Sequence, residues 1–301
     1  MAYRLKNKES FSKSIKRIVL EQIDEALQNL KPKSRNKDEA IHDARVCIKK
    51  IRAALRLSRD GLGIKLYEYE DKKYREVARK LSESRDGAAM LEIIDKLVEH
   101  FADPLADDPF RSVRLTLRRE KKSRTQDRQQ AMKEAAQQLR SLRKQVHKWP
   151  KDNDGQVLIK GLHRTFKGGR RRFAVVAEKP GVRNFHQLRK QVKHLAHAME
   201  ILRPIWSEII TSFAEELNTL GGYLSEDHDL AILGQHVSDE LPDAETHGET
   251  EALAGLIDQR RSELEVKAKD LGTKIFAETP RAFAERFEVY LRVWRNEVSV
   301  D

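Results

Sequence analysis

The sequence predicts an all-α fold, and three observations support this prediction. Charged residues make up 36% of the 301 residues and aromatic residues only 6%, which is closer to a charged, helix-rich protein than to a β-sandwich or barrel. Prolines, which end helices, divide the chain into long segments in which apolar residues recur at helical spacing. Segments in which apolar and polar residues alternate, as expected of strands, are missing from the sequence.

The positions of proline, glycine and apolar residues predict the helices in order. We expect helices over residues 9–30, 38–59, 65–102, 110–148, 156–177, 182–203, 205–240, 249–276 and 281–297. The third helix is expected to bend at residues 82–86 and the seventh at its two adjacent glycines. Residues 126–143, which are rich in Gln, Ala and Arg, are interpreted as an exposed extension of the fourth helix. Residues 241–250 predict a loop, and residues 151–155 a connector between two halves.

The length allows one large domain or two small ones, with a core that needs neither a disulfide nor a metal. The single Cys47 cannot form an intramolecular disulfide, and the N-terminus lacks the apolar run of a secretion signal. The sequence contains no stretch of about 18 apolar residues, the minimum for a membrane helix. We therefore expect a cytoplasmic protein without a membrane partner.

The net charge of +11 is distributed unevenly along the chain. Residues 1–200 contain 49 Lys and Arg against 27 Asp and Glu, which gives +22, whereas residues 201–301 contain 10 against 21, which gives −11. Such a cationic surplus indicates a polyanionic partner, such as nucleic acid, an acidic membrane or a phosphate polymer. The alternative is a basic surface that only keeps the protein soluble, so the arrangement of the charges must decide.

One segment of the chain is repeated. Residues 41–56 align with residues 185–200 at a shift of 144 positions and without a gap. The apolar positions recur in phase, and both copies contain the pattern H-x-x-R-x-x-x-K. A second motif, L-S-x-x-[RH]-D, occurs at residues 81–86 and at residues 224–229, at a shift of 143 positions.

Two motifs in the same order and at nearly the same separation predict two copies of one helical unit. We expect the copies over about residues 9–150 and 155–297. The alternative explanation is that any two amphipathic helices align over a few turns. That explanation accounts for the apolar matches but not for the shared His, Arg and Lys.

One face of the first repeated helix is cationic. At about 100° per residue, five cationic side chains fall within roughly 80° of one another, beside the apolar face. They are His42, Arg45, Lys49, Arg52 and Arg56. The second copy has His186, Arg189 and Lys193 in the same phase, with Lys190 beside them. Ala196 and Glu200 stand where the first copy has arginines, so we do not expect the two halves to contribute equally.

These two rows of cations, called the stripes below, are suited to a linear polyanion. Their members lie one helical turn apart, about 5.4 Å, and a polymer with a negative group every few ångströms can follow them. Arg binds phosphate through paired hydrogen bonds, Lys supplies a mobile point charge, and His binds more strongly when protonated. Because each stripe borders the apolar face, we expect it to line a groove between helices.

Two other clusters are candidates for the same partner. The first consists of Arg111, Arg114, Arg118 and Lys122, on one face of a predicted helix. The second consists of Lys167, Arg170, Arg171 and Arg172. Two glycines between Lys167 and Arg170 lack side chains and so allow a ligand to approach closely.

Asp86 and Asp229 end the two copies of the second motif. A carboxylate in a basic groove repels an anionic ligand, so we expect these residues to have a structural role. Each would pair with an Arg or His of a stripe and fix its orientation. Direct metal binding and a plain contact at a helix end are the alternatives.

The repeated motifs resemble those of the CHAD family, the conserved-histidine α-helical domain. The resemblance consists of the two H-x-x-R-x-x-x-K helices, the two L-S-x-x-[RH]-D segments and an F-K-x-G-R stretch over residues 166–170, and it spans about residues 9–297. It implies a single CHAD-like domain over residues 1–301. Within it, the resemblance implies two four-helix-bundle-like halves related by a pseudo-two-fold axis, with a basic groove or pore between them.

The resemblance also implies the ligand, inorganic polyphosphate. The residues that it places on the polymer are His42, Arg45, Lys49, Arg52, Arg170, His186, Arg189 and Lys193. We expect non-catalytic binding in the cytoplasm, with polyphosphate granules as a further location. A nucleic-acid-binding protein is the alternative, because phosphodiesters also attract Lys and Arg. The few aromatic residues count against a protein that stacks single-stranded bases.

Three short patterns are typical of enzymes, but each lacks its usual context. Residues 68–72 match the E-x-E-x-K motif of triphosphate-tunnel domains, which need an antiparallel barrel that this sequence does not predict. Two His-Asp pairs resemble those of metal-dependent phosphohydrolases, the less favoured alternative, yet His42 lies among Arg and Lys, which disfavour a divalent cation. Glu39 and His42 form half of a di-iron signature that has no second half. We expect no catalytic residue, cofactor or metal.

Overall fold

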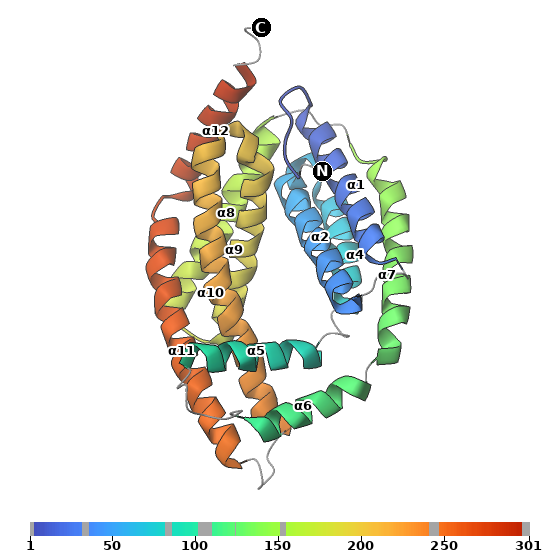
Figure 1. Cartoon of the computed structure of the whole chain (residues 1–301). Helices are drawn as coiled ribbons and strands as arrows, with labels where there is room; N and C mark the ends of the chain where they lie inside the picture. The colour runs from blue at the N-terminus through green and yellow to red at the C-terminus, as the bar shows by residue number, and fades with distance from the viewer. Residues whose placement is uncertain are drawn as a thin grey trace.

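The structure, a computed structural model, describes residues 3–31, 36–81, 86–101, 110–123, 125–150, 155–240 and 247–296. In these ranges all regular secondary structure is helical, which confirms the predicted all-α class (Figure 1). The N-terminal helices are α1 (Phe11–Asn29), α2 (Lys37–Leu57), α3 (Arg59–Leu62), α4 (Ile64–Lys80), α5 (Asp86–Phe101), α6 (Arg111–Ser123) and α7 (Thr125–Val146). The C-terminal helices are α8 (Gly155–Glu178), α9 (Val182–Leu202), the 3-10 turn η1 (Arg203–Ile205), α10 (Ser207–Glu240), α11 (His247–Ile275) and α12 (Pro280–Asn296).

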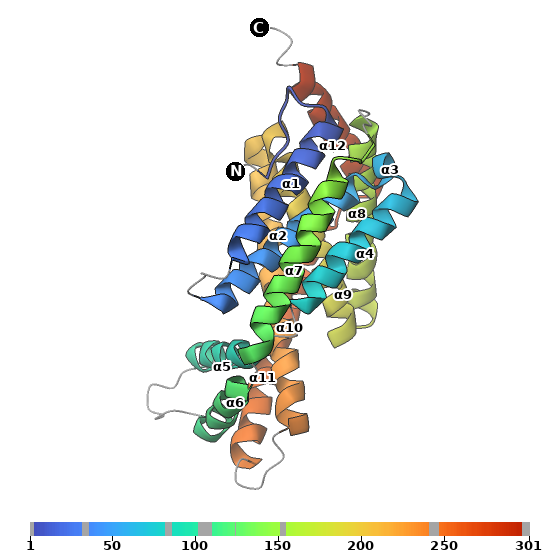
Figure 2. The same ribbon diagram turned by 90° about the vertical axis from the view of Figure 1, so that its right-hand side faces the viewer.

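Two hydrophobic cores hold the described helices together. The larger core joins α1, α2, α4 and α7 to α8, α9, α12 and the first half of α10, and it includes Ile51 of α2 and Leu195 of α9. The smaller core joins α5 and α6 to the second half of α10 and to α11, around Ile94 and Leu233. The helices of the smaller core form a lobe at the foot of the molecule in Figures 1 and 2.

Helices α2 and α9, which contain the two repeated segments, pack against each other in the larger core. The Asn36 side chain accepts hydrogen bonds from the N–H groups of Asp38 and Glu39 and so caps the start of α2. Helix α8 approaches the end of α2 at Gly161, where a Cβ atom would lie 2.2 Å from the carbonyl oxygen of Leu57. Only glycine allows this approach, which brings basic residues of α8 near those of α2.

Residues 3–10, called the strap below, connect helices that lie far apart in the sequence. The Leu5 N–H donates a hydrogen bond to the carbonyl of Ile201 at the end of α9, at 2.9 Å. The Tyr3 hydroxyl donates to the carbonyl of Lys50 on α2, at 2.7 Å. The strap therefore contacts both α2 and α9 beside the place where they pack together.

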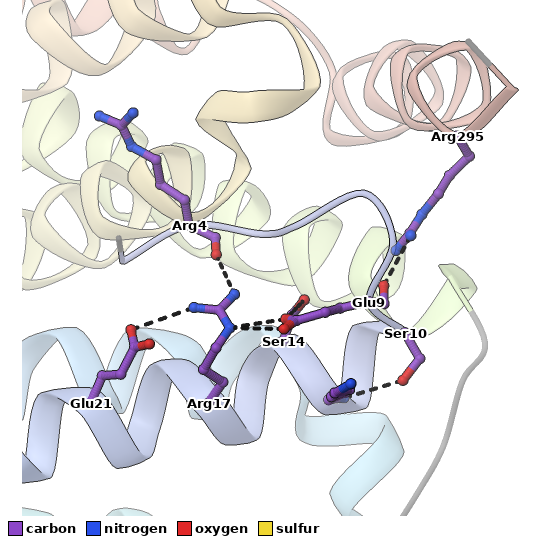
Figure 3. Close-up of polar contacts among 8 residues, drawn as sticks. Arg4, Glu9, Ser10, Ser14, Arg17, Glu21 and Arg295 are labelled. Atoms are coloured by element: carbon purple, nitrogen blue, oxygen red, sulfur yellow. Dashed lines mark hydrogen bonds and ion pairs between the residues drawn. The ribbon is translucent and has the colours of Figure 1, made fainter. Parts of the chain in front are cut away.

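The second part of the strap contacts α12 and α1 (Figure 3). Arg295 of α12 donates to the carbonyl of Glu9 at 2.9 Å. The Glu9 carboxylate accepts from Nε of Arg17 on α1, also at 2.9 Å. One short segment thus links the helices of the N-terminal part to those of the C-terminal part.

Two predicted helices are divided in the structure. Residues 65–102 contain α4 and α5, and residues 82–85 between them lie outside the described residues. Residues 110–148 contain α6, which packs against α5 and α11, and α7, which packs against α1 and α4. By contrast, α10 continues as one helix through its two adjacent glycines.

The expectation that residues 126–143 form an exposed extension is wrong. Helix α7 packs on α1 and α4, and Met132, Leu139 and Leu142 are buried in the larger core. The alanines between these residues widen the apolar face, and the abundant Gln and Arg concealed it in the sequence. Arg128 is also buried, and its Nη1 lies 2.9 Å from Oδ1 of Asp38.

Among the described helices, none combines the length and the apolar character needed to cross a membrane. The two repeated halves, over about residues 9–150 and 155–297, and the groove between them stay predictions.

Candidate anion-binding site

The first stripe lies on α2. His42 is exposed near the start of the helix, and Arg45 and Lys49 are half-buried at its middle. Arg52 and Arg56, near its end, are also half-buried and contact α4. The stripe therefore extends from solvent at one end into the helix packing at the other.

Arg52 and Arg56 share one carboxylate, that of Asp71 on α4. Nε of Arg52 lies 2.8 Å from Oδ1 of Asp71, and Nη1 of Arg56 lies 3.6 Å from the same oxygen. Burial acts to raise the pKa of the Asp71 carboxyl, but the hydrogen bond and charge of Arg52, followed by the charges of Arg56 and Arg75, hold it below its ordinary value. The carboxylate is therefore ionised at neutral pH.

The contact between α2 and α9 brings like charges together. Lys190 lies on α9, and partial loss of solvent around its ammonium, followed by the charges of Arg52 and Arg189, lowers its pKa. Burial, followed by the charges of Arg56 and Arg52, lowers the pKa of His194 well below its ordinary value. The cations of α2 therefore act across the interface on those of α9.

The same effect occurs at His197, one turn further along α9. Burial, followed by the charges of Lys50 and Lys49, lowers the pKa of His197 to about 4. This imidazole is neutral at pH 7, so the interface avoids a further positive charge. An anion at this interface would reduce the repulsion between the remaining cations.

The second stripe faces α10. The rings of His186 and His228 lie with their centroids 4.1 Å apart. Burial, followed by the charges of His228, Lys190 and Arg189, lowers the pKa of His186 to about 4. Nε of Arg189 donates a hydrogen bond to Oγ of Ser225 at 3.1 Å. Arg189 and the neutral His186 thus both contact residues of α10.

Asp229 lies near the second stripe, as its predicted role requires. Burial and the charge of Arg189 lower the pKa of Lys193, while the charge of Asp229 acts in the opposite direction. Asp229 therefore interacts with a lysine of the stripe, and its orienting role stays a prediction. The side chain of Asp86 lies outside the described residues.

A pocket of about 330 Å³ lies among α2, α3, α4, α8 and α9. Its cationic lining residues are Arg56, Arg59, Arg164, Lys167 and Arg171. The other lining residues are Tyr67, Thr165, Gly168 and Gln191. Because none of these nine side chains is acidic, the pocket is suited to an anion.

Two arginines of this pocket are fixed in position and keep donors without partners. Nη2 of Arg164 lies 2.7 and 2.6 Å from the two carboxylate oxygens of Asp60, whereas its Nη1 is buried and has no hydrogen-bond partner. The guanidinium of Arg59 lies 5.4 Å from the ring centroid of Tyr67, and its Nε is likewise buried without a partner. Each such donor costs about 1–3 kcal/mol as long as it has no acceptor.

Sequence reasoning missed Arg59, Arg164 and Tyr67. Arg59 belongs to the four-residue helix α3, which is too short to show a periodic pattern in the sequence. Arg164, however, lies three and seven residues before Lys167 and Arg171 on one predicted helix, so the helical spacing of its cations could have identified it.

Three predicted site residues belong neither to the lining of this pocket nor to the two stripes. Nε of Arg170 donates to the carbonyl of Phe276 at 3.2 Å. Arg114 and Arg118 belong to α6 in the lobe at the foot of the molecule, and Arg114 forms an ion pair with Asp95. Helix α6 packs against α5 and α11, whereas the stripes lie on α2 and α9.

The E-x-E-x-K pattern lies within the helix α4, where its second glutamate serves packing. Glu70 is buried and accepts a hydrogen bond from Nε1 of Trp149 at 3.1 Å. In the part of the chain that the structure describes, no three His, Cys, Asp or Glu side chains are grouped to hold a metal ion.

Comparisons with known proteins agree with the arrangement of the helices. A family model described as CHAD domain matches residues 17–238. The fold is similar to that of PptA from Streptomyces chartreusis, with a TM-score of 0.60 and 16% identity over 90% of this chain and 100% of that chain. It is also similar to that of the CHAD domain from the plant Ricinus communis, with a TM-score of 0.59 and 15% identity over 97% of this chain and 95% of that chain. No curated protein matches the sequence.

Proposed function

The chain belongs to the CHAD domain family, and we propose that it binds inorganic polyphosphate without turning it over. The resemblance of its repeated motifs to that family implies this ligand. The proposal also treats residues 1–301 as a single domain that acts in the cytoplasm and at polyphosphate granules.

The observation that best supports the proposal is the basic pocket beside the end of α2. Its lining combines five cations, no carboxylate and two buried N–H donors that have no partner. Phosphate oxygens accept hydrogen bonds and carry the complementary charge, so they satisfy both requirements. A polymer has the further advantage that it can extend from the pocket to the stripes.

Arg56 links the pocket to the stripes, because it lines the pocket and belongs to α2. Adjacent units of one polymer could thus contact the pocket and the α2–α9 interface at the same time. The residues that we propose to contact the polymer are His42, Arg45, Lys49, Arg52, Arg56, Arg59, Arg164, Lys167, Arg171, His186, Arg189, Lys190 and Lys193. Arg114, Arg118 and Arg170 are not part of this proposed surface.

A titration of the full chain at matched salt tests the proposal, with long polyphosphate, pyrophosphate, duplex DNA and RNA as ligands. We expect long polyphosphate to bind more tightly per site than pyrophosphate, because only a polymer engages the pocket and the stripes together. Its affinity should fall steeply with salt, as for other polyanions that release counterions. Equal affinity per site for both phosphates would contradict the proposal, and tighter binding of nucleic acid would favour the alternative.

A pair of matched variants connects binding to the pocket. Arg59→Gln with Arg164→Gln removes two pocket cations, whereas Arg140→Gln with Lys144→Gln removes two exposed cations from α7. We expect the first variant to weaken polyphosphate binding by about 100-fold, at roughly 1.4 kcal/mol for each lost charged hydrogen bond. The second variant should change the affinity by less than about threefold.

A further inference from the structure

We propose that Asp71 is a positioning residue for polyphosphate, which orders Arg52 and Arg56 before the ligand arrives. This inference rests on the proposed function. It concerns an acidic residue inside a basic site, where a simple view of charge predicts that a carboxylate only weakens the binding of an anion.

The contact between Asp71 and Arg52 fixes the plane of the guanidinium. Nε of Arg52 lies 2.8 Å from Oδ1 and Nη2 lies 3.3 Å from Oδ2, so one edge of the guanidinium faces the carboxylate. A planar guanidinium presents further donors on its other edge, at Nη1. The charge of Arg52 acts on Lys190 and His194 of α9, which places this arginine between α4 and the second stripe.

Asp71 holds Arg56 at the same time. Nη1 of Arg56 lies 3.6 Å from Oδ1 of Asp71 and donates to the carbonyl of Arg52 at 3.3 Å. Arg56 also lines the basic pocket. One carboxylate therefore couples the arginine at the α2–α9 contact to the arginine in the pocket, and it sets their spacing.

Burial prevents Asp71 from competing with the ligand at the surface. The side chain of Asp71 is 8% exposed, and those of Arg52 and Arg56 are 18% and 23% exposed. The carboxylate thus lies deeper than the two guanidinium groups that it contacts. A third contact, from Nη2 of Arg75 at 3.1 Å, completes its hydrogen bonding on the side of α4.

Ordering of these side chains before binding lowers the cost of binding. A free arginine loses rotamer entropy when it contacts a ligand, at about 0.5–1.5 kcal/mol for each side chain that becomes immobile. Because Asp71 orders both arginines when the protein folds, this rotamer entropy is already lost before the ligand binds. It also reduces the repulsion between two adjacent arginines, which would otherwise point away from each other.

The two views of Asp71 predict opposite results for Asp71→Asn in the full chain. If only net charge matters, the loss of a negative charge strengthens polyphosphate binding. If Asp71 positions the arginines and both lose their phosphate contacts without it, the affinity should fall by about 100-fold, and the slope of log K against log salt should become shallower by about 1.8, at 0.9 for each of two phosphate contacts. Asp43→Asn is the matched control, because Asp43 is an exposed carboxylate on α2; it should leave the affinity unchanged or slightly higher.

Loss of folded protein would lower the number of binding sites per chain but not the salt slope of those that remain. A second variant, Arg52→Lys, keeps the charge but cannot make the two-bond contact with Asp71. It should weaken binding more than Arg45→Lys, which makes the same chemical change two turns earlier on α2. Equal effects of these two variants would overturn the positioning role even if Asp71→Asn failed to fold.

The outcomes separate the two proposals. A wild-type chain that does not bind polyphosphate would overturn both. A wild-type chain that binds, with Asp71→Asn binding as tightly or more tightly at an unchanged salt slope, would overturn only the role of Asp71. Weaker binding with a shallower slope, alongside an unaffected Asp43→Asn, would support it.

Discussion

The imidazole rings of His186 on α9 and His228 on α10 are in tilted contact, with their centroids 4.1 Å apart and their planes inclined by 36°. Burial, followed by neighbouring charges that include Lys190 and Arg189, lowers the pKa of both imidazoles to about 4. Both rings are therefore neutral in the free protein at pH 7. A polyanion placed against them would raise both pKa values.

The affinity for polyphosphate should therefore depend on pH. The free imidazoles titrate near 4, so binding takes up protons below the pKa of the bound state and down to about pH 4. We expect the affinity to increase as the pH falls from 6.5 towards 4, and the double variant His186→Gln, His228→Gln to flatten this increase. Calorimetry in two buffers of different ionisation enthalpy measures the proton uptake directly. Zero uptake at pH 5 would show that the two rings only pack together.

Without ligand, the same shift predicts a loss of stability in acid. An ordinary imidazole titrates near 6.5, so between pH 6.5 and about 4 the unfolded chain binds more protons at His186 and His228 than the folded chain does. The free energy of unfolding must then decrease as the pH falls through this window. Urea unfolding at pH 7 and pH 5 should show the decrease, and the double variant should show less of it.

Charge reversal on both stripes should weaken polyphosphate binding strongly. We expect Arg45→Glu with Arg189→Glu to lower the affinity for polyphosphate by at least about 100-fold, because two charged hydrogen bonds are lost and two repulsive groups are added. Arg140→Glu with Lys144→Glu on the exposed face of α7 is the matched control and should have a small effect. Titrations at equal salt measure the affinities of both double variants, and circular dichroism checks that they are folded. Equal weakening would mean that the charge acts diffusely.

We expect two glycine substitutions to have opposite effects on stability, because Gly161 lies where α8 approaches α2 and Gly222 lies in open space. In Gly161→Ala the new Cβ would meet the carbonyl oxygen of Leu57 at 2.2 Å, a backbone atom that cannot move away alone. We expect a loss of about 3 kcal/mol in the free energy of unfolding. Gly222→Ala, in α10, meets no atom within 4 Å and should stabilise the protein by about 0.5–1 kcal/mol. Denaturant unfolding of both variants provides the measurement.

The strap predicts that a short N-terminal segment contributes to global stability. Leu5 is 3% exposed and packs in the larger core, so Leu5→Ala should cost about 3 kcal/mol. Arg4→Ala is the control, because Arg4 is exposed and contributes its backbone carbonyl to Arg17. If both variants unfold at the same denaturant concentration as the wild type, the strap does not hold the two parts together.

The proposal of a binding protein predicts that no orthophosphate is released from polyphosphate, pyrophosphate or nucleoside triphosphates. The reason is that a cationic surface neutralises the ligand but supplies no activated water or nucleophile. The assay uses purified protein with magnesium, manganese or zinc. Release that depends on the metal and disappears in His42→Ala would show an enzyme.

The sequence predicted the fold class and the helices of the stripes because helical periodicity is a local property. Arg52 and Arg189 could be placed on basic faces from their spacing alone. The position of α7 could not be predicted in this way, because Ala135 and Ala136, which are weak signals, separate Met132 from Leu139 and Leu142 on its buried face. The separation of Arg114 from the stripes also depends on packing between helices that are distant in the sequence.

The pocket likewise could not be predicted from local sequence patterns. Arg59 and Arg164 become neighbours because α8 can approach α2 at Gly161, and this approach is a property of the packed helices. The role of Asp71 could not be predicted from the sequence either. Its neighbours in the sequence match an enzymatic motif, but its side chain contacts two arginines of another helix. Only the packed structure distinguishes these roles.

The strap has a consequence for the order of events during synthesis on the ribosome. The carbonyl of Glu9 accepts a hydrogen bond from Arg295, which is 286 positions later in the chain. The amide side chain of Asn7 likewise donates to the carbonyl of Trp294, which is 287 positions later. Because domains generally fold as units, these contacts of Asn7 and Glu9 must wait for the last described helix. A nascent chain that stalls before α12 could therefore attach the strap to α1, α2 and α9 but would leave its contacts with α12 unmade.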